Sequence, residues 1–526
     1  VESAEQAREL CWIARADEEL LGSASRPIVL LERRAEANVA PEVAPGSPWL
    51  GVMLAYAPLQ HLLLRDFGAP LVMTSGNLSH EPIAHRDDDA RERLSQIADG
   101  FLTHDRAIER RSDDSVVRAL PSGRLTLRRA RGMAPEPLRL AESLRRPLLA
   151  LGGQSAVCFA LGREQHVFLS HHIGDLDDHA AHRSYVEAIR EYTELFRIEP
   201  ELVVHDLHPD YASTMLARAL AAERDLPAFG VQHHHAHIAA VMLEHGLEGP
   251  VIGVAFDGTG LGSDGTIWGG EFLICDRGWF ERAAHLRAVP MPGGDRAVLE
   301  PWRMAVAYAR DAGRSSEGRF PELEKERRLV EKLIERGAFC PKSSGAGRLF
   351  DAVSALAGVC LRSRYDGQAA IELEWAAARS VADGCYDFTI GPGADGGAQI
   401  DTRPLFAGVM DDLARGATAG EVARRFHRTL VALVVAACER LREDYGLERV
   451  VLGGGVFANA LLVEGLSQAL PERGFSLYRP ELHPPGDGAL ALGQLAIAAA
   501  VERVSSVPGE SRAPESIAAG DEPVCA

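Results

Sequence analysis

Residues 228–257, AFGVQHHHAHIAAVMLEHGLEGPVIGVAFD, decide the fold of this chain. The apolar residues 228–232 predict a strand, residues 235–245 predict a helix, and residues 251–256 predict a strand of the fully buried type. A further strand is expected over residues 266–274. Alternating strands and helices of this kind favour an α/β fold, in which helices cover the faces of a sheet.

The pattern extends on both sides of this stretch. Residues 148–151, 156–161, 166–171 and 202–206 predict strands, and residues 179–196 and 213–223 predict helices. Three strands followed by a helix, a strand and a helix partly recur after Val251. Two such halves favour a two-lobed, actin-like ATPase architecture for residues 146–503.

A separate α/β domain is expected over residues 1–145. Residues 26–31, 69–77, 115–118 and 125–130 predict its strands, and the prolines Pro135, Pro137 and Pro147 bracket a linker. Residues 504–526 are rich in Ser, Pro, Glu and Gly, so we expect a disordered tail there.

Composition restricts the classes of function. A formal charge of −19 argues against nucleic acid as the main partner, and no apolar run is long enough to cross a bilayer. The eight cysteines form no C-x-x-C pair, which favours a reducing cytoplasm over a disulfide framework or a zinc finger. The chain starts at Val1 without a signal peptide, and we expect it to be a fragment.

His233 and His237 lie four residues apart where a strand gives way to a helix, so both imidazoles can face one metal ion. Asp257 ends a buried strand and Asp487 precedes a helix, and both are positions that line clefts in α/β folds. Two histidines and two aspartates suit iron or zinc. Taken alone, a His-rich turn of this spacing is more often a polar surface than a metal site.

Glycine-rich turns offer backbone N–H groups to a nucleotide, although each by itself is also compatible with an ordinary tight turn. One comprises Gly258, Thr259 and Gly260, and another runs from Gly454 to Asn459. Neither matches a Walker A or a dinucleotide motif. In the first domain, hydroxyl, amide and guanidinium groups that could hold a triphosphate belong to Thr74, Ser75, Asn77, Ser115 and Arg118. Turn chemistry beside a solvated basic edge is the alternative for this set.

These segments resemble the HypF family of hydrogenase-maturation carbamoyltransferases along nearly the whole chain. The first domain is similar to the YrdC/Sua-type domain of that family through Val72-Met-Thr-Ser-Gly-Asn, Asp113-Asp-Ser-Val-Val-Arg and Arg128-Arg-Ala-Arg-Gly-Met. The second is similar to its Kae-type domain through Gln232-His-His-His-Ala-His, Asp257-Gly-Thr-Gly, Tyr365-Asp-Gly-Gln-Ala-Ala-Ile-Glu and Gly454-Gly-Val-Phe-Ala-Asn.

The resemblance implies a two-step reaction. Carbamate, derived from carbamoyl phosphate, reacts with ATP and Mg²⁺ to give carbamoyl adenylate, and the carbamoyl group then passes to the C-terminal cysteine thiol of the partner HypE. By position, the metal ligands would be His233, His237, Asp257 and Asp487. The residues lining the adenylate would be Gly258, Thr259, Gly260, Asp351, Glu372, Gly454 and Asn459.

The chain departs from the family pattern in ways that leave alternatives open. The acylphosphatase-like domain and the Cys-rich zinc modules of the family are absent, so we expect no hydrolysis of carbamoyl phosphate by this chain alone. Ala156 stands where a lysine is expected near the phosphate. A nucleotide-binding scaffold, a small-molecule O-carbamoyltransferase and a tRNA-modifying enzyme are the competing hypotheses. The oligomeric state is left open.

Overall fold

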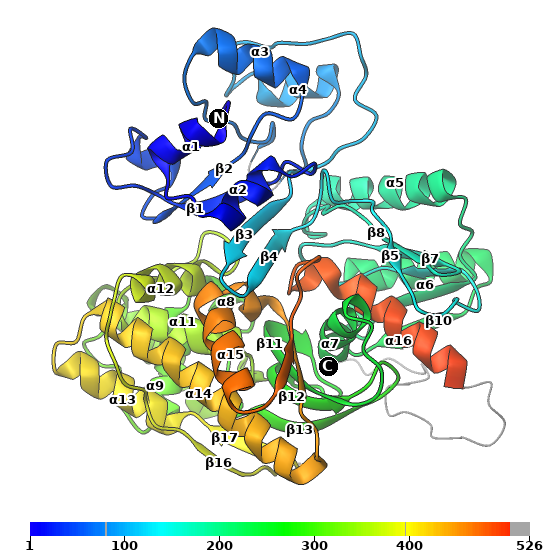
Figure 1. Ribbon diagram of the computed structural model, residues 1–526. Helices are drawn as coiled ribbons and strands as arrows, with labels where there is room; N and C mark the ends of the chain where they lie inside the picture. Colours follow the sequence, from blue (N-terminus) through cyan, green and yellow to red (C-terminus); the bar gives the residue numbers. More distant parts are fainter. Residues whose placement is uncertain (79–80, 395, 505–526) are drawn as a thin grey trace. The chain divides into compact units, whose positions relative to one another are not determined.

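The computed structural model describes residues 1–78, 81–394 and 396–504 (Figure 1). Among the described residues, the chain divides into two compact units, one comprising Val1–Val231 with residues 480–504, the other comprising Gln232–Arg479. Both units mix strands and helices, so the predicted α/β class is confirmed. The expected boundary near residue 145 lies inside the first unit and stays a prediction. The expected tail lies outside the described residues from residue 505 onward.

The first unit opens with a mixed four-stranded sheet of order β2-β1-β3-β4 among the described residues. Strands β1 and β3 run parallel, and the other two pairs are antiparallel. Its strands are β1 (Ile28–Glu32), β2 (Trp49–Val52), β3 (Val116–Leu120) and β4 (Gly123–Arg128). Its helices are α1 (Ala4–Leu10), α2 (Arg15–Gly22), the short η1 (Pro41–Val43), α3 (Pro58–Phe67) and α4 (Asp87–Leu94).

The strand predicted over residues 69–77 is wrong, because the structure gives this segment no regular secondary structure. Val72 is 71% exposed and Met73 is 43% exposed, so the apolar side chains that suggested a buried strand face outward. A strand is stable only when a neighbouring strand accepts and donates its backbone hydrogen bonds, and the sheet order places no strand beside this segment.

The second sheet of this unit has the order β10-β9-β6-β7-β8-β5. Alternate residues of its central strands point to opposite faces: Leu149 and Val203 pack against α5 and α6, whereas Gly162 lies against Leu495 of α16. The strands are β5 (Leu138–Arg139), β6 (Leu148–Ala150), β7 (Ala160–Arg163), β8 (His166–Leu169), β9 (Leu202–Asp206) and β10 (Ala228–Val231). The helices are α5 (His179–Phe196), α6 (Ala212–Arg224), the short η4 (Asp487–Ala489) and α16 (Leu490–Val504).

The second unit is built on one sheet whose main path is β16-β17-β13-β12-β11-β18-β19. At its centre β11 pairs antiparallel with β12 and parallel with β18. The strands are β11 (Val251–Leu261), β12 (Ile267–Cys275), β13 (Phe280–Leu286), β14 (Val289–Pro290), β15 (Lys342–Ser343), β16 (Thr389–Pro392), β17 (Ala398–Asp401), β18 (Arg449–Gly453) and β19 (Ser476–Tyr478).

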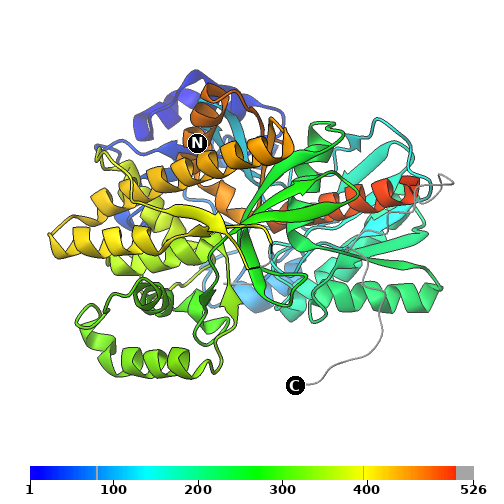
Figure 2. The same cartoon turned by 90° about the horizontal axis from the view of Figure 1, so that it is seen from below.

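Helices pack around this sheet. Ile238 and Val241 of α7 form a buried cluster with Val251 and Ala255 of β11, and α11 and α14 also contact β11. Figure 2 shows α13 and α14, in yellow and orange, lying beside one another. The helices are α7 (His233–Glu244), α8 (Arg296–Leu299), α9 (Trp302–Asp311), η2 (Pro321–Leu323), α10 (Glu324–Arg336), α11 (Ala346–Leu356), α12 (Gln368–Ala378), α13 (Arg403–Ala414), α14 (Ala419–Tyr445), η3 (Gly455–Ala458) and α15 (Ala460–Glu472).

The helices and strands expected around the His-rich segment are confirmed, with small shifts at their ends. Helix α7 starts at His233 instead of residue 235, and β11 continues past residue 256 through the glycine turn to Leu261. In the described part of the chain, no helix combines the length and the apolar character needed to cross a membrane.

Candidate functional site

Two histidines at the start of α7 project in the same direction. The side chain of Gln232 caps the helix by accepting a hydrogen bond from the backbone N–H of His235 at 3.0 Å. Its amide nitrogen donates to the carbonyl oxygen of Leu261 at 3.0 Å, which ties the start of the helix to the end of β11. His233 and His237, one helical turn apart, are both almost fully buried. The strand-to-helix change therefore fixes the backbone from which both imidazoles project.

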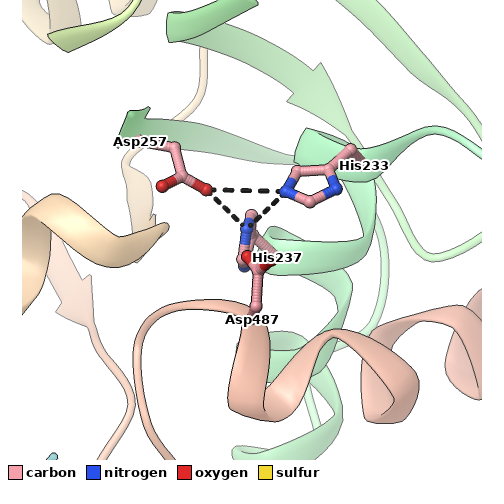
Figure 3. A group of neighbouring side chains, drawn as sticks. All are labelled: His233, His237, Asp257 and Asp487. Carbon is pink, nitrogen blue, oxygen red and sulfur yellow. Dashed lines mark hydrogen bonds and ion pairs between the residues drawn. The ribbon is translucent and has the colours of Figure 1, made fainter. Parts of the chain in front are cut away.

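Asp257 completes a cluster of three side chains within the second unit. Its Oδ2 atom lies 2.8 Å from Nε2 of His237 and 3.6 Å from Nε2 of His233. The two Nε2 atoms are 3.2 Å apart. Figure 3 shows the two rings and the carboxylate pointing toward one another from α7 and from β11. Two ligand atoms from α7 and one from β11 thus meet in a buried space.

The surroundings keep Asp257 ionised. Burial raises the pKa of its carboxyl, but hydrogen bonds and charge interactions with His233 and His237 outweigh burial and hold this pKa well below 3.8. Its other oxygen, Oδ1, accepts hydrogen bonds from the backbone N–H groups of Gly258 at 2.7 Å and Gly455 at 3.3 Å. A carboxylate fixed at one oxygen presents the other to the histidines.

The three donors fit a divalent metal ion. Two ligands bound to zinc at about 2.1 Å in tetrahedral geometry are about 3.4 Å apart, and the three separations here lie on either side of that value. Oδ2 of Asp257 is buried, and the Nε2 atoms of both His233 and His237 face it. A cation between these atoms would satisfy all three, and the same donors suit iron.

The neighbouring histidines differ from these two. Burial lowers the pKa of His234 to about 3 and that of His235 to about 4, so both rings are neutral at pH 7. Nε2 of His235 lies 2.7 Å from the carbonyl oxygen of Asp276 and donates to it. The ring of His234 lies against Gly260. His233 and His237 therefore face Asp257, whereas His234 and His235 pack against other parts of the unit.

Asp487, the fourth predicted ligand, belongs to the other unit, where it begins η4 and is followed by α16. Gly153 lies beside it: a Cβ atom at residue 153 would stand 3.0 Å from Oδ2 of Asp487. Figure 3 includes this residue with the three described above. Its contribution to the ligand set stays a prediction.

The predicted glycine turns meet around Asp257. Gly258, Thr259 and Gly260 lie on β11 at a shift in its register with β12. The backbone of Gly454, at φ +102°, lies so close to Phe256 that a Cβ atom there would meet its carbonyl oxygen at 2.3 Å. A left-handed backbone and this contact both require glycine. The turns are therefore brought together by packing across the sheet.

The remaining residues predicted to line an adenylate lie on helices of the same unit. Asp351, on α11, is buried beside Arg348, and burial raises the pKa of its carboxyl to about 6. Glu372, on α12, accepts a hydrogen bond from Gln368 at 2.7 Å. Asp351 and Glu372 both act on the pKa of the Cys360 thiol, which burial raises, so the two carboxylates lie near the same point.

Asn459 is held inside the protein by both ends of its amide. Its oxygen accepts from the N–H of Leu462 and caps α15, and its nitrogen lies 2.9 Å from Nε2 of His427. Nδ1 of His427 donates to the carbonyl oxygen of Ala423, so Nε2 of the neutral ring is the acceptor. Burial lowers the pKa of His427 to about 4, which keeps this tautomer at pH 7.

In the first unit the predicted nucleotide residues occupy different environments. Thr74, Ser75 and Asn77 lie in a turn, where the Asn77 amide donates to the carbonyl oxygens of Leu78 and Glu81. The hydroxyl of Ser115 is buried and bonds to the backbone of residues 130 and 131. The guanidinium of Arg118 lies 3.8 Å above the ring of Trp49. Their role as nucleotide ligands stays a prediction.

Two residues near the site were missed by sequence reasoning: Arg348 and His427. Arg348 follows Gly345-Ala-Gly at the start of a helix, a pattern that permits close backbone approach and could have been noticed. His427 lies within a long amphipathic helix, and its spacing there is no different from that of a core residue.

Comparisons with protein families match the three parts of the chain. Residues 1–130 match the Sua5/yciO/yrdC family, described as telomere recombination. Residues 143–244 match the HypF Kae1-like domain, and residues 253–494 match the carbamoyltransferase Kae1-like domain, second subdomain. Fold and candidate site together define a Kae1-like protein that carries a YrdC-like domain on the same chain.

Individual relatives narrow this class. The chain is 42% identical to carbamoyltransferase HypF2 of Cupriavidus necator, over 92% of this chain and 65% of the relative. It is 40% identical to a carbamoyltransferase HypF homolog of the same organism, covering 67% of this chain and 91% of that protein. A crystal structure of full-length HypF in its phosphate- and nucleotide-bound form matches 97% of this chain and 79% of the other, at 38% identity and a TM-score of 0.90. The chain belongs to the HypF carbamoyltransferase family. It spans about two thirds of the length of several curated relatives, 63% to 65%.

Proposed function

We propose that this chain transfers a carbamoyl group from carbamoyl adenylate to a cysteine thiol in [NiFe]-hydrogenase maturation, with the C-terminal cysteine of HypE as acceptor. The observation that carries the proposal is the buried meeting of His233, His237 and Asp257 beside the glycine turns of β11 and β18. A metal-type donor set next to glycine-rich turns suits a mixed anhydride of carbamate and a nucleotide phosphate. Membership of the HypF family supports this chemistry.

The metal site of the proposal consists of His233, His237 and Asp257, with Asp487 as the fourth ligand. A bound iron or zinc ion would polarise the carbonyl and phosphate oxygens of the adenylate. An ion held by these four protein ligands could still bind substrate if its coordination number rose from four to five. Because the two histidines and Oδ2 of Asp257 are buried, a substrate held against them is protected from hydrolysis by bulk water.

The first step is assigned to the YrdC-like part, where carbamate attacks the α-phosphate of Mg-ATP and pyrophosphate leaves. Thr74, Ser75, Asn77, Ser115 and Arg118 are the proposed nucleotide ligands there. The carbamate derives from carbamoyl phosphate. A triphosphate needs hydrogen-bond donors and positive charge, and hydroxyl, amide and guanidinium groups supply them.

In the second step the acceptor thiol loses its proton to water, the resulting thiolate attacks the carbamoyl carbon, and AMP leaves with the electrons of the C–O bond. The adenylate is proposed to lie along Gly258, Thr259, Gly260 and Gly454, with Asp351, Glu372 and Asn459 around its nucleoside. Asp351, whose carboxyl has a pKa of about 6, is mostly ionised at pH 7 and can accept a hydrogen bond from a ribose hydroxyl.

The acceptor must be a reduced thiol, which places the reaction in the cytoplasm. The cysteines of the described residues are unpaired, in keeping with a reducing compartment.

The test is a transfer assay. The chain, ATP, Mg²⁺, bicarbonate-derived carbamate or carbamoyl phosphate, and a peptide ending in the HypE cysteine are incubated, and the peptide mass is followed. We expect a gain of one carbamoyl group as a thiocarbamate, with release of pyrophosphate. Unmodified peptide, under conditions in which another HypF protein reacts, would contradict the proposal. Binding of the acceptor without pyrophosphate release would indicate a scaffold instead.

The ligand assignment has its own matched pair of variants. His237→Ala removes a ring that faces Asp257, and we expect it to lose bound metal and transfer while the fold is kept. His235→Phe keeps a ring on the same helix but removes the nitrogen that donates to the carbonyl oxygen of Asp276, and we expect normal metal content with a slightly lower Tm. Elemental analysis of both variants decides the assignment, because equal metal content in the two would refute it.

A further inference from the structure

The start of α11 lies directly against the turn that follows Asp257. Gly345, the residue before the helix, has no side chain to cap it, and a Cβ atom there would meet the carbonyl oxygen of Gly258 at 2.2 Å. A Cβ atom on Gly347 would lie 2.9 Å from Cα of Gly258. The absence of side chains at these positions permits the contact. The helix N-terminus therefore lies beside Gly258, the residue that follows the proposed metal ligand Asp257.

Arg348, in the first turn of this helix, is 95% buried, with only 5% of its surface exposed. Its Nε atom lies 2.8 Å from Oδ2 of Asp351. Its Nη1 atom is buried and makes no hydrogen bond to a described residue. Its Nη2 atom is 3.7 Å from the position that a Cβ atom on Gly258 would take, so the guanidinium faces the glycine turn.

Asp351 pairs with one edge of the Arg348 guanidinium. A guanidinium carries five N–H donors, and a single carboxylate on one edge leaves the others to find acceptors. Buried donors without acceptors are costly, so a charged group kept in this state indicates a ligand that completes it. An α-helix also leaves the N–H groups of its first turn without acceptors inside the helix, and its dipole favours negative charge there. Both features point to the same place.

We propose that the N-terminus of α11 and the guanidinium of Arg348 form a phosphate subsite beside Gly258, which takes the phosphate of an adenosine 5′-phosphate. The inference rests on the proposed function, because the adenylate is the phosphate ester that would occupy the subsite. Phosphate oxygens match the fork of a guanidinium, and they are the usual ligands of a helix N-terminus. The competing interpretation is that Arg348 only balances the charge of Asp351.

The test compares two photoreactive nucleosides that differ by the phosphate. The whole chain is titrated with 8-azido-AMP or 8-azidoadenosine, and saturation is followed on labelled peptides from residues 232–479 by mass spectrometry. Restricting the readout to these peptides separates this site from nucleotide bound by the YrdC-like part. For the unaltered chain we expect 8-azido-AMP to bind at least 10-fold more tightly than 8-azidoadenosine.

In Arg348→Gln we expect the affinity for 8-azido-AMP to fall 10- to 100-fold while that for 8-azidoadenosine stays within twofold. Arg348→Lys keeps the charge without the fork, and its loss should be intermediate. The matched control is Arg327→Gln on α10: Arg327 is equally buried, but all three of its nitrogens pair with Glu324 and Glu331. This control should lose stability and keep the preference for the phosphate.

The outcomes separate the subsite from the function on which it rests. If the unaltered chain labels with neither probe in residues 232–479, the nucleotide site itself is refuted. If it prefers 8-azido-AMP and Arg348→Gln keeps that preference, the subsite is refuted and the proposed function stands. If Arg348→Gln loses affinity equally for both probes while Arg327→Gln keeps the affinities of the unaltered chain, the phosphate subsite is refuted and Arg348 is a structural partner of Asp351. Should Arg348→Gln fail to fold, the comparison is made with Arg348→Lys.

Discussion

Gly260 on β11 leaves space for the ring of a proposed metal ligand. A Cβ atom at this residue would lie 2.6 Å from Cε1 of His234 and 2.9 Å from Cδ2 of His233. Real carbon atoms do not approach so closely, and both rings are buried, so neither has room to move aside. The backbone of Gly260 is outside the left-handed region, and alanine would meet no conformational strain there. In Gly260→Ala the rings must therefore shift by several tenths of an ångström.

The cost can be divided into two parts. Adding a methyl group to a close-packed interior destabilises the fold by about 1–3 kcal/mol. Displacing a metal ligand through its neighbour weakens metal binding by about 10- to 100-fold. Gly253→Ala is the matched control. Gly253 lies on β11, as Gly260 does, and its Cβ atom would lie 2.8 Å from Cγ1 of Ile238 on α7. Ile238 is not a ligand, so this control carries the first cost without the second.

Metal affinity is measured by competition with a chromophoric zinc chelator, and stability by urea unfolding of the metal-free proteins. We expect both variants to lose similar stability and only Gly260→Ala to lose metal affinity. Two results would refute the reasoning: unchanged affinity in Gly260→Ala, or an equal loss of affinity in Gly253→Ala.

Three other predictions concern neighbouring groups. The carboxyl of Asp351 has a pKa of 3.8 in the unfolded chain and about 6 in the folded protein. Between these values the folded protein holds a proton that the unfolded chain has released. The free energy of unfolding therefore falls as pH rises from about 4 to 6, by about 3 kcal/mol from this group. Urea unfolding across this range should give a flatter profile for Asp351→Asn, and an unchanged slope would contradict the assignment. Asn459→Ala removes the cap of α15 and the partner of His427, and a loss of about 1–2 kcal/mol is expected in thermal or urea unfolding. Asp487→Asn should weaken zinc or iron binding at least 10-fold in the chelator assay without changing the Tm of the metal-free protein, whereas full affinity would remove Asp487 from the ligand set.

The order of helices and strands could be predicted because it depends on local patterns. The apolar residues 251–256 are buried on both faces of the sheet, as a continuous apolar run predicts. The helix over residues 179–196 was predicted with the bounds of α5, since an amphipathic period and the Asp178 cap define its length. Residues 69–77 show the limit, because an apolar run becomes a strand only if another strand lies beside it.

For the candidate site, the sequence by itself determined that His233 and His237 project from one helical face, because a spacing of four residues is a property of any α-helix. It also identified Asp257 as the residue that follows the buried apolar run 251–256, although β11 continues beyond it to Leu261. Only the tertiary structure decided that this carboxylate reaches both rings, since β11 and α7 are joined by packing and by the bond from Gln232 to Leu261. Arg348 was found in the same way. Its importance arises from buried donors facing Gly258, a residue 90 positions earlier, and contacts over such a separation are fixed by packing and leave no periodicity in the sequence.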